Sequence, residues 1–100
     1  MAVYVDEPVW EWRGRRWCHL LADSDEELHA FAAALGLKRA WFQHRPASPW
    51  KDHYDIPSEL RAEAVRAGAV EVDLRFVAVH VRVRRERIVG AVARTARGRG

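Results

Sequence analysis

Histidine and aspartate side chains gather in two short stretches of this 100-residue chain. Residues 17–29 hold the only cysteine, two of the five histidines and Asp23. The second stretch, His53-Tyr54-Asp55, places an imidazole and a carboxylate two residues apart, so an extended backbone would point both the same way. Because the two stretches could meet in the folded chain, we expect one cleft with these candidate catalytic residues: His19, Asp23, His29, His53 and Asp55.

Mixed histidine and carboxylate ligands suit Zn²⁺, Mn²⁺ or Fe²⁺, and such a metal can activate water for attack on a phosphoester. The metal ligands that we predict are His53, Asp55 and Asp6. Asp6 and Asp23 each follow a strand-like run, and sites of open α/β sheets form beyond the carboxyl ends of strands. No recognised metal-binding motif is present, however.

Simpler structural roles compete for the same residues. Asp23 and Asp55 are placed to assist helix caps, and His29 lies at the border of an apolar helix stripe. Strand alternation separates Cys18 from His19, so the two cannot easily serve one site. We expect Cys18 to be an inert buried thiol, since reactivity needs a lowered pKa.

The sequence pattern predicts that a small α/β domain positions these side chains, with three to five short strands in one sheet and two helices. Ser24-Asp25-Glu26-Glu27 fits the capping box of a helix over about 24–35, which Gly36 closes. A second helix is expected over about 58–67, capped by Asp55 or Ser58. Residues 44–57 hold three prolines and are expected to be mostly loop. The expected strands are residues 2–5, 17–22, 40–43 and 69–73.

Charge divides the chain at about residue 73. Residues 1–73 carry nine Lys/Arg against thirteen Asp/Glu, whereas residues 74–100 carry eight Arg against Glu86 alone. We therefore predict a domain over 1–73 and a Val/Arg-rich basic tail over 74–100. Valines alternate through residues 77–83, which indicates a last strand; a short helix could follow over 86–95, and the end from Arg97 should be disordered. The arginines that could contact nucleic acid are Arg82, Arg84, Arg85, Arg87, Arg94, Arg97 and Arg99.

The composition indicates one globular domain with a single core, because 49% of the residues are hydrophobic and 31% charged. No apolar run is long enough to span a bilayer, so we predict no membrane partner. A lone cysteine agrees with a reducing compartment, and the expected location is cytoplasmic.

Several short motifs occur in an order that resembles the uncharacterised domain-of-unknown-function family 4031, whose members are small bacterial and phage proteins. The motifs are Ala2-Val3-Tyr4-Val5-Asp6, Cys18-His19-Leu20, Ala22-Asp23 with Glu27-Leu28-His29, Trp41-Phe42-Gln43, His53-Tyr54-Asp55 and Ala67-Gly68-Ala69. The resemblance covers about residues 1–73, and the basic tail departs from it. Since the family has no established activity, the resemblance implies little about function.

From the residues themselves, the first function that we predict is binding of a small phosphate-containing or nucleotide-like ligand in the His/Asp cleft, with metal-assisted hydrolysis as its chemistry. The alternative is a non-enzymatic nucleic-acid or protein adaptor, with Trp10, Trp12 and Trp50 as stacking groups and the C-terminal arginines as phosphate contacts. A third interpretation is a structural accessory domain without a small-molecule site.

Overall fold

A single mixed sheet forms the centre of the computed structural model, which describes the backbone of residues 2–98 and the side chains of residues 2–95. The strand order is β4-β5-β3-β1-β6, and β2 pairs with β3 outside this path. All pairs are antiparallel except β1 with β6. The strands are β1 Val3–Val5, β2 Trp10–Trp12, β3 Arg15–Ala22, β4 Phe42–Gln43, β5 His53–Pro57 and β6 Val70–Glu71.

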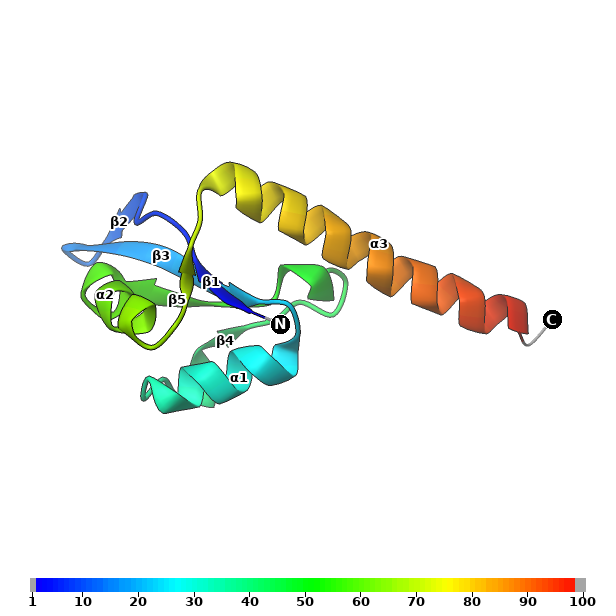
Figure 1. Cartoon of the computed structure of the whole chain (residues 1–100), viewed down its shortest axis with the longest axis horizontal. Helices are drawn as coiled ribbons and strands as arrows, with labels where there is room; N and C mark the ends of the chain where they lie inside the picture. The colour runs from blue at the N-terminus through cyan, green and yellow to red at the C-terminus, as the bar shows by residue number, and fades with distance from the viewer. Residues whose placement is uncertain (1, 99–100) are drawn as a thin grey trace.

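Helices cover both sides of this sheet. Helices α1 and α2 lie on one side and α3 crosses the other, with its last turns extending beyond the sheet (Figure 1). Two short 3₁₀ helices, η1 and η2, lie in the connections on either side of β4. The bounds are α1 Asp25–Ala34, η1 Arg39–Trp41, η2 Pro49–Lys51, α2 Ser58–Arg66 and α3 Leu74–Gly98. The small α/β class predicted from the sequence is confirmed, with a third helix and more strands than expected.

The core lies between the sheet and the α1/α2 layer. Alternation on β3 sends Cys18, Leu20 and Ala22 to this side, and all three are fully buried. Tyr54 and Ile56 of β5 join them from the neighbouring strand, at 1% and 0% exposure. The predicted burial of Cys18 is confirmed, and this burial raises the pKa of its thiol to about 12.

The first helix begins as its capping box predicts. The Ser24 hydroxyl oxygen accepts a hydrogen bond from the Glu27 backbone N–H at 3.2 Å and donates one to the Glu27 carboxylate at 3.1 Å. Gly36 follows the helix with a φ of 83°, a conformation that glycine adopts without a steric cost. These local signals therefore fix where α1 begins and ends.

The prediction that residues 44–57 are mostly loop is wrong at their end, because residues 53–57 form the interior strand β5. Asp55 is part of this strand and caps no helix. The N-cap residue of α2 is Pro57, which makes no side-chain cap hydrogen bond, so the caps expected from Asp55 and Ser58 are also wrong. Proline is tolerated there because it ends the strand and leads into the helix, where its missing N–H is not needed.

The strand predicted over residues 77–83 is wrong as well, since residues 74–98 form α3. Alternating valines suggested a strand, but Val77 and Val81 also lie four residues apart on one helix face, whereas Val79 and Val83 remain 44% and 41% exposed. The Asp73 carboxylate accepts a hydrogen bond from the Phe76 N–H at 2.8 Å and caps this helix. The backbone of residues 97 and 98 belongs to α3, and residues 99 and 100 of the expected disordered end lie outside the described part.

Candidate functional site

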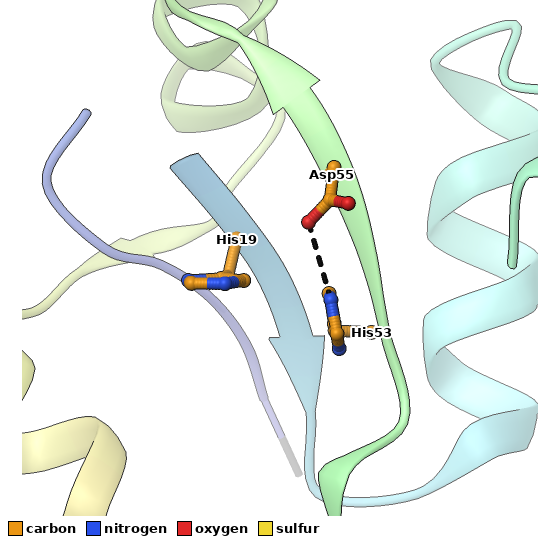
Figure 2. A group of neighbouring side chains, drawn as sticks. All are labelled: His19, His53 and Asp55. Atoms are coloured by element: carbon orange, nitrogen blue, oxygen red, sulfur yellow. Dashed lines mark ion pairs between the residues drawn. The ribbon is translucent and has the colours of Figure 1, made fainter. Parts of the chain in front are cut away.

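Two histidines and one aspartate lie together on the side of the sheet that faces α3. His19 of β3 stands directly opposite Asp55 of β5, and His53 is two residues before Asp55 on the same face (Figure 2). One ligand atom from each residue lies within 4.8 Å of the other two. The side chains are between one quarter and one third exposed, so solvent reaches the cluster. We call these three residues the His-Asp cluster.

The ring of His19 is held from behind by Asp6, which is fully buried after β1. One Asp6 carboxylate oxygen lies 2.6 Å from His19 Nδ1, and the other accepts a hydrogen bond from the His19 backbone N–H, also at 2.6 Å. A carboxylate on Nδ1 favours the tautomer whose Nε2 is free to bind a cation. Asp6, which the sequence predicted as a metal ligand, thus orients the His19 ring, and His19 stands in the group of three with His53 and Asp55.

His53 is oriented in the same manner by a backbone carbonyl. Its Nδ1 lies 2.7 Å from the carbonyl oxygen of Lys51, which can only accept, so this nitrogen carries the hydrogen. Its Nε2 then faces an Asp55 carboxylate oxygen at 3.1 Å. Burial opposes protonation of His53, but the hydrogen bonds to Asp55 and to Lys51 outweigh it and raise the His53 pKa. This arrangement favours a cation between His53 Nε2 and the Asp55 carboxylate. The cation can be a proton or a metal ion.

A cavity of about 190 Å³ adjoins the cluster under α3. His19, Leu21 and His53 line it from the sheet, and His80 and Arg84 line it from the helix. Lys51 and Trp50 close its side at η2. Lys51 adds a positive charge to this lining, whereas the Arg84 guanidinium is paired with the Asp25 carboxylate at 3.3 Å and the buried Asp52 also lines the cavity.

Two residues of the predicted cleft lie elsewhere. Asp23 accepts hydrogen bonds from the backbone N–H of Ala2 at 2.8 Å and from the Tyr4 hydroxyl at 2.9 Å, at the far end of β3. His29 belongs to α1, across the sheet from the cluster, where its Nδ1 lies 2.9 Å from the Tyr54 hydroxyl. Burial and the nearby Arg39 charge lower the His29 pKa. The structure does not bring either residue to His53.

A buried carboxylate beside the cavity was not singled out by the sequence. Asp52 is 2% exposed, and His44 Nδ1 lies 2.7 Å from its Oδ1. Its Oδ2 is buried and, among the described residues, has no hydrogen-bond donor. Burial and the charge of the nearby Asp25 carboxylate raise the pKa of Asp52 to about 6, although His44 acts to lower it. No local sequence signal marks Asp52, because its partners come from other elements.

These features define the class of protein: a small α/β domain that carries two partly exposed histidines and one carboxylate on its sheet. No curated protein and no solved structure matches the chain. The chain belongs to the family described as Protein of unknown function (DUF4031), whose model matches residues 3–94. The expectation that the family resemblance ends at about residue 73 is wrong, because the match continues to residue 94 and includes most of α3. Within the described part of the chain, no helix is both long and apolar enough to cross a membrane.

Proposed function

We propose that the His-Asp cluster binds a divalent transition-metal ion and that this ion holds a phosphate-containing ligand in the cavity under α3. One observation carries the proposal: three potential ligand atoms from His19, His53 and Asp55 lie within 4.8 Å of one another while both histidines are anchored through Nδ1. Histidines that bind metals are commonly fixed by a carboxylate or carbonyl on the second ring nitrogen. Two histidines and one carboxylate leave open positions on Zn²⁺, Mn²⁺ or Fe²⁺.

Metal-assisted hydrolysis of a phosphoester is the chemistry that we infer for this site. An ion held by His19, His53 and Asp55 would lower the pKa of a bound water and so supply a nucleophile for phosphorus. Attack by this water would break the phosphorus–oxygen bond to the leaving alcohol, which would take up the proton that the water gives up. Lys51 lines the cavity beside the cluster and would offset the charge of the phosphate. The single buried Cys18 fits a reducing compartment, so the cytoplasm is the location that we propose.

Metal binding tests this proposal directly. The purified chain is stripped with a chelator, and its melting temperature is measured with Zn²⁺, Mn²⁺ or Fe²⁺ added. We expect at least one ion to raise the melting temperature of the native chain. The same ion should leave the melting temperature of the His53→Gln variant almost unchanged, because an amide replaces the imidazole ligand. His29→Gln is the matched control on the opposite side of the sheet, and it should respond like the native chain.

An activity measurement completes the test. With the stabilising ion bound, the native chain should hydrolyse a chromogenic phosphomonoester or phosphodiester faster than the metal-free chain does, and His53→Gln should lose this difference. Absence of any metal-dependent shift in melting temperature would remove the basis of the proposal. A shift without hydrolysis would reduce it to ligand binding.

A basic helix surface favours a nucleic-acid adaptor as the second candidate function. Arg82, Arg85, Arg87 and Arg94 of α3 are exposed, and the Arg85 guanidinium lies 5.3 Å from the centre of the Trp50 ring. If these arginines contact phosphates, the affinity for DNA or RNA should fall steeply as salt rises. We expect a chain that ends at residue 84 to lose this binding. Unchanged binding after the deletion, or none at low salt, would exclude this candidate.

A further inference from the structure

A second, larger cavity of about 430 Å³ opens at the outer edge of β5. Strand β4 covers this edge only at His53 and Tyr54, and no described strand pairs with β5 beyond them on that side. The cavity therefore lies where the sheet edge is left open. Its volume falls in the range of small-molecule sites in proteins, which is about 300–1,000 Å³.

Aromatic and amide side chains give this cavity its chemistry. Trp17 and Trp41 line it with their indoles, Leu37 and Leu60 add apolar side chains, and Gln43 adds a polar one. Flat heteroaromatic rings stack well on indoles, and a glutamine amide can both donate to and accept from the edge of a base. These are the groups that a nucleobase requires.

Positive charges flank both indoles. The Arg15 guanidinium lies 5.9 Å from the centre of the Trp17 ring, and the Lys38 ammonium lies 5.7 Å from that of Trp41. Arg15 also pairs with the Glu59 carboxylate at 3.1 Å. A base that stacks here would have cations beside its ring, which strengthens stacking on an aromatic platform.

Asp55 connects this cavity with the His-Asp cluster. Its carboxylate is a member of the cluster, and the same residue lines the aromatic cavity. His53, the next member, lines the smaller cavity under α3. A ligand with its base against Trp17 and Trp41 would thus present its phosphate at the cluster.

We propose that the ligand of this protein is a nucleotide, with its base in the Trp17/Trp41 cavity and its phosphate at the metal held by the His-Asp cluster. The inference rests on the proposed function for the placement of the phosphate, but the base cavity stands on its own residues. A sugar phosphate or inorganic phosphate can also bind through its phosphate at the metal. Neither has a base to place in the Trp17/Trp41 cavity.

Calorimetric titration of the metal-loaded chain with AMP, GMP, CMP, UMP and ribose 5-phosphate tests the inference. We expect at least one nucleotide to bind ten times more tightly than ribose 5-phosphate. Trp41→Ala should weaken nucleotide binding about five- to hundredfold and leave ribose 5-phosphate binding unchanged. Trp41 is 47% exposed, so the substitution leaves the core intact, and Trp41→Phe should keep most of the affinity because it retains a stacking ring.

Equal affinities for the nucleotides and ribose 5-phosphate, or no effect of Trp41→Ala, would overturn the inference while leaving the metal site standing. A separate titration of the metal-free chain with the free nucleosides, adenosine, guanosine, cytidine and uridine, isolates the base cavity. Binding of a nucleoside that Trp41→Ala weakens supports the cavity even if no metal binds. Absence of nucleoside binding, together with a normal metal response, rejects the nucleotide and retains the proposed function.

Discussion

Replacing Asp52 by asparagine should make the free energy of unfolding less dependent on pH. Asp52 is 2% exposed, and its pKa in the folded chain is about 6 against an ordinary value of 3.8. The unfolded chain therefore holds the proton less tightly than the folded chain, so Asp52 contributes stability when it is protonated. This contribution is present below about pH 4 and is lost as the pH rises through about 6.

The size of the effect follows from the same two pKa values. One pKa unit corresponds to 1.36 kcal/mol, so the interval from 3.8 to about 6 gives about 3 kcal/mol as an upper bound. Asparagine resembles the protonated acid in shape and carries no charge, and its carbonyl can accept from His44 Nδ1. Asp52→Asn should therefore match the native chain near pH 4 and exceed its stability by about 1–3 kcal/mol at pH 8.

This difference is measured by urea unfolding, followed by tryptophan fluorescence at pH 4.5, 5.5, 6.5 and 8. A chelator is present to exclude metal effects. His44→Gln is the matched control, because it removes the group that lowers the pKa of Asp52 and should move the transition to higher pH. The reasoning would be refuted if the difference in stability between Asp52→Asn and the native chain stayed constant over this pH range. It would also be refuted if this difference shrank as the pH rises.

Three further substitutions or reactions test other parts of the structure. Asp6→Asn should lower the affinity of the proposed metal site about 10- to 100-fold, measured by competition with a chelator, and unchanged affinity would contradict the orienting role of Asp6. Ser24→Ala should reduce the free energy of unfolding by about 1 kcal/mol, whereas Ser24→Asp should retain it; equal losses in both would argue against the cap. Cys18, with a thiol pKa of about 12, should react with a thiol reagent only as fast as the chain unfolds, and rapid labelling of the native chain would contradict its burial.

Local sequence signals predicted the elements that depend on neighbouring residues. Ser24 and Glu27 placed the start of α1, and alternation along β3 correctly put Cys18 and His19 on opposite faces. The same kind of reasoning failed where two periods coincide, as in the valines of α3, and where prolines border a buried strand, as at Pro57.

The site could be predicted only in part, because its assembly depends on the register between distant strands. The spacing of His53 and Asp55 was sufficient to place both on one face once the segment is extended. The pairing of His19 with Asp55 has no local signal, nor does the turn of the Asp6 carboxylate toward the back of His19. His29 was grouped with the wrong face, since the sequence does not tell on which side of the sheet α1 packs.

The pairing of β3 with β5 has a consequence for the order of events in folding. His19 comes from one of these strands and His53 and Asp55 come from the other, so the loop between them must close before the three residues meet. The same closure buries Leu20 beside Tyr54 and so completes the centre of the core. Assembly of the His-Asp cluster and formation of the central strand pair are thus a single non-local step, and a chain that loses this pair loses the cluster with it.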